Sequence, residues 1–185
     1  MLRSPNQSRH PAALAVLLRG VVAGAIGTAA MDLAQYARYR SGGSESLLSW
    51  EFRGVKNWDD APAPAQVGKR LSEGLFRTEL PDKAANTVNN AMHWAYGIGW
   101  GAGFALLADS VRAPRTRWGA IFGTVVWLTD YAVLPATGLY KPIWAYDAKT
   151  LGKDWADHLV YGTATAAAFG ALSSAQPART AFGRD

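Results

Sequence analysis

The same five-residue motif, H-x-x-Y-G, occurs twice, as His93-Trp94-Ala95-Tyr96-Gly97 and as His158-Leu159-Val160-Tyr161-Gly162. Each copy opens a long apolar stretch, and a phenylalanine, Phe104 or Phe169, follows each histidine by eleven residues. An apolar stretch that holds one aspartate precedes each copy. The pattern predicts two copies of a helix pair, with an aspartate on the first helix and a histidine on the second.

The two aspartates, Asp32 and Asp130, each follow an arginine, Arg19 or Arg117, by thirteen residues. The twelve residues between each arginine and its aspartate extend about 18 Å along a helix, which is shorter than the bilayer core of about 30 Å. If these segments cross a membrane, one charge of each pair lies inside it. Ionisable residues within membrane helices are typical of functional sites.

Four apolar blocks each approach the length of roughly 20 residues that crosses a bilayer. They are residues 12–35, 88–108, 118–140 and 155–175. We therefore predict an all-α polytopic membrane protein, a single domain over residues 1–185, with a four-transmembrane-helix bundle built from two repeated helix hairpins. A soluble helical bundle is the alternative, and a cleaved signal peptide ending near Thr28-Ala29-Ala30 is the alternative for the first block.

Glycines spaced by four residues occur in three of the blocks, which predicts close backbone packing between helices. They are Gly20 with Gly24, Gly97 with Gly101, Gly99 with Gly103, and Gly119 with Gly123. The outer connection, about 36–86, is predicted to hold a short amphipathic helix, because Val67, Leu71, Leu75 and Phe76 recur at helical spacing. Such a helix fits either the membrane surface or the flank of the bundle.

Lysine and arginine in short flanks mark the cytoplasmic side of a membrane protein. Arginines occur in the N-terminal tail, the 109–117 connection and the C-terminal tail. Four spans place these three segments on one side, so both termini are predicted to be cytoplasmic. Arg38 and Arg40, just after the first span, favour the opposite orientation.

Six polar side chains form the predicted centre of the protein. They are Asp32, His93, Asp130 and His158, supported by Tyr96 and Tyr161. One interpretation is a hydrogen-bonded network that fixes packing. A second is a divalent metal site with two histidine and two aspartate ligands. The third is a proton relay in a transporter, and the fourth is a haem between the two histidines.

The composition excludes several other kinds of site. The chain has no cysteine, which removes disulfides, thiolate metal sites and iron–sulfur clusters. It contains no nucleophile-elbow and no phosphate-binding-loop motif, so we do not predict an enzyme. The net charge of +5 comes from short flanking segments, and we predict no nucleic-acid partner.

The chain resembles the YagU-like family of uncharacterised small bacterial inner-membrane proteins. The resemblance covers about residues 90–165. It rests on the two H-x-x-Y-G copies and on Trp127-Leu128-x-Asp130 with Pro135-x-x-Gly138-Leu139. It implies a helical bundle in the bacterial cytoplasmic membrane and brings no activity, cofactor or catalytic residue.

These observations together lead us to expect a non-enzymatic subunit or assembly partner of a membrane complex. Its partners would be the lipid bilayer and other membrane subunits or further copies of itself. The alternatives are a proton- or metal-linked transporter and a metal or haem site inside the bundle.

Overall fold

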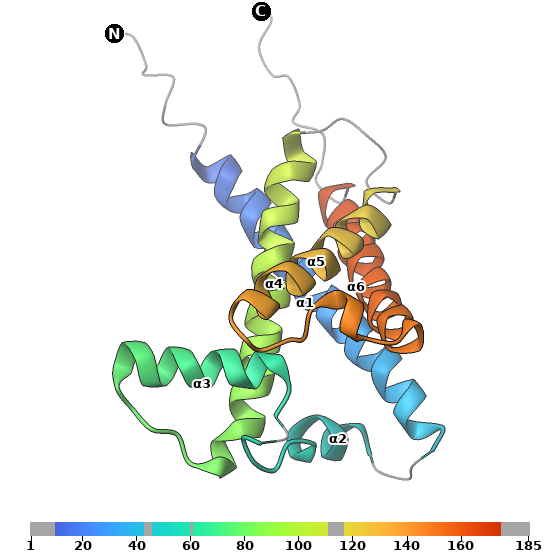
Figure 1. The fold of residues 1–185 in the computed structure, drawn as a ribbon. Helices are drawn as coiled ribbons and strands as arrows, with labels where there is room; N and C mark the ends of the chain where they lie inside the picture. Colours follow the sequence, from blue (N-terminus) through green and yellow to red (C-terminus); the bar gives the residue numbers. More distant parts are fainter. Residues whose placement is uncertain (1–9, 43–45, 60, 111–116, 175–185) are drawn as a thin grey trace, which may run out of the picture.

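The computed structural model describes residues 10–42, 46–59, 61–110 and 117–174. Over these residues the protein is all-helical and contains no strand, which confirms the all-α part of the prediction. Figure 1 shows the helices, which are α1 (His10–Arg40), α2 (Leu47–Arg53), α3 (Ala63–Phe76), α4 (Ala85–Ser110), α5 (Arg117–Ala136) and α6 (Ala148–Ser174). Two short 3-10 turns, η1 (Asp82–Ala84) and η2 (Ile143–Ala145), precede α4 and α6.

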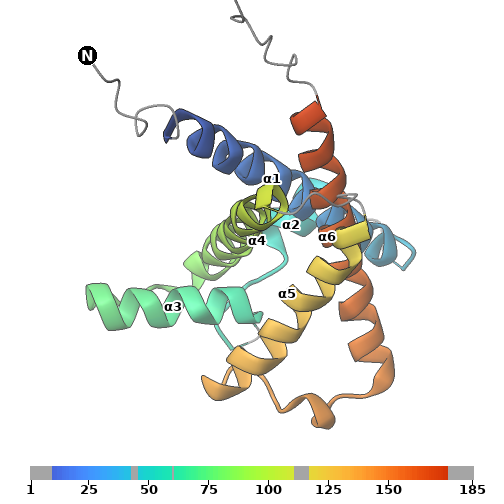
Figure 2. The same cartoon turned by 90° about the horizontal axis from the view of Figure 1, so that it is seen from above.

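The four long helices, α1, α4, α5 and α6, cross near their middles (Figures 1 and 2). The backbone of α1 packs against both α4 and α6, and α5 packs against α6. The fourth side, between α5 and α4, is closed by side chains instead. The ring centroid of Phe122 on α5 lies 4.8 Å from that of Phe104 and 6.1 Å from that of Trp100, both on α4.

Glycines set how closely these helices approach. A Cβ atom added to Gly24 of α1 would lie 2.6 Å from the carbonyl oxygen of Gly97 on α4. A Cβ added to Gly162 of α6 would lie 2.5 Å from the backbone nitrogen of Gly123 on α5. Both distances are far below van der Waals contact, so these crossings require residues without side chains.

The predicted role of the glycine pairs is therefore confirmed at three of them. Gly20 and Gly24 pack against Gly97 and Gly101, and Gly119 and Gly123 pack against the segment around Gly162. The prediction was wrong for Gly99 and Gly103, which have no neighbour within 4 Å of an added Cβ. Residues two apart on a helix point about 200° apart, so this pair faces away from the packed side of α4.

The helix bounds differ from the predicted blocks by four residues or more at three ends. The first helix continues five residues past residue 35 to Arg40. The third ends at Ala136, after Pro135, where Gly138 turns the backbone into the left-handed region with φ 71°. The last begins at Ala148, because Asp147 accepts a hydrogen bond from the backbone N–H of Thr150 at 2.9 Å and caps the helix.

Two of the described helices, over Ala13–Arg40 and Trp118–Ala136, are long and apolar enough to cross a membrane. They belong to α1 and α5. Helices α4 and α6 have 26 and 27 residues, which is sufficient length, but glycine, tryptophan, tyrosine and threonine make them less apolar.

The outer connection contains the predicted amphipathic helix as α3. Its first half packs on α4, where Ala65 is fully buried and Gly68 approaches Val88 and Met92. Its far end projects from the other helices (Figure 1) and leaves Leu75 and Phe76 mostly exposed. The helix therefore flanks the long helices at one end and presents apolar side chains at the other.

Candidate functional site

The first aspartate–histidine pair joins α1 to α4. Nε2 of His93 lies 2.8 Å from Oδ1 of Asp32, a geometry in which the imidazole N–H donates to the carboxylate. Asp32 is only 7 % exposed. Its second oxygen, Oδ2, is buried and has no hydrogen-bond partner, so the carboxylate is half satisfied.

The second aspartate–histidine pair joins α5 to α6, and its histidine again uses the Nε2 atom. Nε2 of His158 lies 3.1 Å from Oδ2 of Asp130, and Tyr96 of α4 donates its hydroxyl to the other oxygen of Asp130 at 2.6 Å. Nδ1 of His158 lies 2.8 Å from the carbonyl oxygen of Asp154. Both oxygens of Asp130 and both nitrogens of His158 are therefore partnered.

The hydrogen bonds of the second pair fix where its protons lie. A carbonyl oxygen can only accept, so Nδ1 of His158 carries a hydrogen. Nε2 then either donates to an ionised Asp130 as part of an imidazolium or accepts from a protonated Asp130. In both cases one proton lies between the two side chains, and the pair as a whole has no net charge.

The structure brings the predicted site residues together in pairs and not as one ligand set. Among the described residues, no group of three or more histidine, aspartate or glutamate side chains is placed to hold a metal ion. Asp32 with His93, and Asp130 with His158, form two separate contacts, and the metal site stays a prediction. Each histidine turns Nε2 to an aspartate, so a haem between the two would require breaking both pairs.

The two predicted tyrosines have different roles. Tyr96 belongs to the second pair, through Asp130. Tyr161 is 2 % exposed and donates its hydroxyl to the carbonyl oxygen of Gly97 at 2.6 Å, which fastens α6 to α4.

Sequence reasoning missed one ion pair beside the two Asp–His pairs. Arg38 near the end of α1 binds Asp157 of α6, and Asp157 is only 6 % exposed. The available signal was its position, since Asp157 directly precedes His158.

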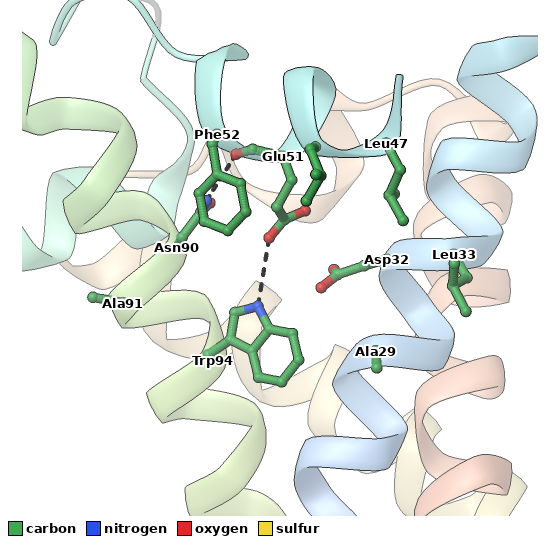
Figure 3. A pocket seen from close by; sticks show the side chains of 10 residues that line it. Ala29, Asp32, Leu33, Leu47, Glu51, Phe52, Asn90, Ala91 and Trp94 are labelled. Carbon is green, nitrogen blue, oxygen red and sulfur yellow. Dashed lines mark hydrogen bonds between the residues drawn. The ribbon is translucent and has the colours of Figure 1, made fainter. Parts of the chain in front are cut away.

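A pocket of about 550 Å³ lies between α1, α2 and α4 (Figure 3). Its walls are mostly apolar, and the carboxyl groups of Asp32 and Glu51 point into the same region of it (Figure 3). The indole N–H of Trp94 lies 3.5 Å from Oε1 of Glu51. Glu51 was also missed from the sequence, although it is the acidic residue between the aromatic side chains Trp50 and Phe52.

Two asparagines of α4 hold Glu51 in place. The main-chain oxygen of Glu51 accepts hydrogen bonds from the amide groups of Asn86 at 3.2 Å and Asn90 at 2.7 Å. Burial is the main cause that raises the pKa of Glu51, and the nearby Asp32 carboxylate raises it further.

Comparisons with protein-family models, with curated proteins and with solved structures found no match for this chain. The resemblance to the YagU-like family therefore stays a prediction. The function has to be inferred from the two pairs, the pocket and the surface of the long helices.

Proposed function

We propose that this chain is an integral membrane protein with four spans, and that it acts as a non-enzymatic subunit or assembly partner of a membrane complex. The observation that carries the proposal is the large apolar outer surface of the long helices, together with the two Asp–His pairs that lie between them. Ionisable side chains lie between the long helices, and large apolar side chains lie on their outer surface.

The apolar outer surface is most regular on α1 and α5. Only 39 % of the apolar window of α1 and 28 % of that of α5 are buried within the protein, whereas a core helix of a soluble protein is mostly buried. The exposed side chains follow helical spacing: Leu14, Leu18, Val22, Ile26 and Leu33 on α1, and Trp118, Ile121, Val125 and Leu128 on α5. Soluble monomers rarely expose continuous apolar surfaces of this kind, and lipid is the solvent that suits them.

The contacts of α4 and α6 with the other long helices support the proposal that these two helices also cross the membrane. α4 packs on α1, and α6 packs on both α1 and α5. The histidines of both helices turn towards aspartates on their neighbours, which suits less apolar helices shielded by more apolar ones. The same Nε2-to-carboxylate contact in α1–α4 and in α5–α6 supports an internal repeat of two hairpins.

The second pair supports a structural role for the polar centre. Its side chains use their hydrogen-bonding groups on one another and on a neighbouring carbonyl, and so it joins α4, α5 and α6. A fully satisfied polar network between helices fixes how they pack. We propose the bacterial inner membrane as the location, with both termini cytoplasmic, and lipid together with other subunits or further copies as partners.

A proton-linked transporter is the second candidate function. Asp32 favours it, because this buried carboxylate keeps one oxygen without a hydrogen-bond partner and lies beside a pocket. Carboxylates within membrane helices often mark proton relays in pumps and transporters.

Single-cysteine labelling tests the number of spans, since the chain has no cysteine of its own. A membrane-impermeant maleimide is applied to intact cells producing Ser110→Cys, at the end of α4, or Lys141→Cys, after α5. Four spans predict labelling of Lys141→Cys from outside and of Ser110→Cys only after permeabilisation. If only α1 and α5 cross, Ser110→Cys should be labelled from outside and Lys141→Cys only after permeabilisation. Ser41→Cys should be labelled from outside in both cases.

Native mass spectrometry tests the assembly role. The chain is extracted from its own membrane with the surrounding lipid and without detergent. A complex heavier than the 19.8 kDa chain is expected, and a chain that is always alone would contradict the proposal.

A further inference from the structure

We propose that the pocket between α1, α2 and α4 binds a lipophilic organic cation, with the ammonium group beside Asp32 and Glu51 and its apolar part against the pocket walls. This inference goes beyond the proposed function and does not depend on the number of spans. It rests on three properties of the two carboxyl groups: their charge, their hydrogen-bond partners and the side chains around them.

Asp32 is the first observation. The residue is only 7 % exposed, yet its Oδ2 atom has no hydrogen-bond partner. Its other oxygen, Oδ1, is hydrogen-bonded to His93. A buried acceptor without a partner costs free energy unless a ligand completes it. Figure 3 shows the Asp32 side chain directed across the pocket towards Glu51 and Trp94.

Glu51 is the second observation and comes from a different helix. Its carboxyl group shares the pocket with Asp32 (Figure 3), and its backbone is held by Asn86 and Asn90. The residues that line the pocket, as far as the structure describes them, include two acids and no lysine or arginine. His93 contacts Asp32 from outside this lining, and a bound cation would supply further charge that complements the two acids.

The walls indicate what kind of cation fits. Leu33, Leu47 and Phe52 surround the acids, and Trp94 forms one side. Aromatic faces attract organic cations, and tryptophan does so most strongly. A divalent metal suits the pocket poorly, because it needs several oxygen or nitrogen ligands and most of this lining is apolar.

Calorimetric titration of the detergent-purified full chain with benzyltrimethylammonium tests the proposal. Phenylacetate, which carries the same ring and the opposite charge, is the matched control ligand. We expect saturable binding of the cation and none of the anion. Asp32→Asn and Glu51→Gln should each weaken binding of the cation by about tenfold, the effect of losing one charged contact.

Glu73→Gln is the matched control variant, because Glu73 lies on the exposed side of α3, where it pairs with Lys69 at 3.9 Å. It should bind the cation as tightly as the unaltered chain. Circular dichroism shows whether each variant keeps its helices. If Asp32→Asn does not fold, Glu51→Gln alone tests whether the pocket acids bind the cation. The proposal is overturned if the unaltered chain binds no cation, if it binds phenylacetate equally, or if both pocket variants bind as the unaltered chain does.

Discussion

The two aspartate–histidine pairs share one contact and differ in everything around it. In both, the Nε2 atom of a histidine meets a carboxylate on the neighbouring helix. The carboxylate of Asp130 is bonded through both oxygens, whereas that of Asp32 keeps one oxygen without a partner. His158 is also more shielded than His93, with side-chain exposures of 9 % and 25 %.

The difference separates two uses of the same side chains. A pair whose polar groups are all bonded stabilises the packing of its helices and has no atom left for a ligand. A pair with one buried oxygen that has no partner stabilises less, and the proposed cation would supply that partner. The Asp130–His158 pair thus resembles a structural tie, and the Asp32–His93 pair resembles an incomplete binding site.

Removing each aspartate should give unequal losses of stability. Asp130→Ala leaves the buried His158, and Tyr96, without the carboxylate that they share, and we expect it to lower the free energy of unfolding by about 3–5 kcal/mol. Asp32→Ala loses one hydrogen bond and also relieves the repulsion between Asp32 and Glu51, so we expect a loss of only about 1 kcal/mol. Unfolding by sodium dodecyl sulfate in mixed micelles measures both, and equal losses would contradict the comparison.

The backbone crossings that support the pairs should be comparably sensitive to added volume. Gly24→Ala at the α1–α4 crossing and Gly123→Ala at the α5–α6 crossing should each cost about 1–3 kcal/mol, because neither helix can approach its neighbour past a methyl group. Gly103→Ala is the control, since an added Cβ there meets nothing within 4 Å. It should leave the free energy of unfolding unchanged or slightly raise it, and a large loss in that variant would show that the outer face of α4 is packed.

The smallest expected effect is the pH dependence that Glu51 contributes beside the first pair. Because the pKa of Glu51 is raised above its ordinary value of 4.5, the folded state favours the protonated acid. Its contribution to stability is therefore complete below that ordinary value and is lost as the pH rises through the raised pKa. We expect the melting temperature of the unaltered chain to fall relative to that of Glu51→Gln over this window.

Melting curves between about pH 4 and pH 7, which spans the ordinary range for carboxyl groups and histidine, measure that difference. Glu73→Gln removes a carboxyl from the exposed side of α3 and should keep the pH dependence of the unaltered chain. A Glu51→Gln variant with that same dependence would show that Glu51 is not held near Asp32 in solution.

Much of the fold follows from local features of the sequence. Long apolar stretches predicted the long helices, and the spacing of Val67, Leu71 and Leu75 predicted α3. The sequence also placed an aspartate on the first helix and a histidine on the second helix of each predicted pair, but it did not show which of these side chains contact one another.

The rest depends on packing between distant segments. The overlapping glycine pairs of α4 lie on opposite faces of the helix, and only the position of α1 shows which face is packed. Glu51 reaches the pocket because Asn86 and Asn90 bind its backbone from α4. The convergence of four ligands was predicted from residue type alone, whereas the helix crossings bring these side chains together two by two.

The contact of Arg38 with Asp157 changes how charge along the chain relates to orientation. Arg38 finds its partner 119 residues later in the sequence, so this arginine belongs to a neutral ion pair in the folded protein. Under the proposed topology, Arg38 then no longer counts as free positive charge at the end of α1 against the arginines in the flanks proposed to be cytoplasmic. An arginine near the end of a span can thus form an ion pair between two helices without indicating which side of the membrane it lies on.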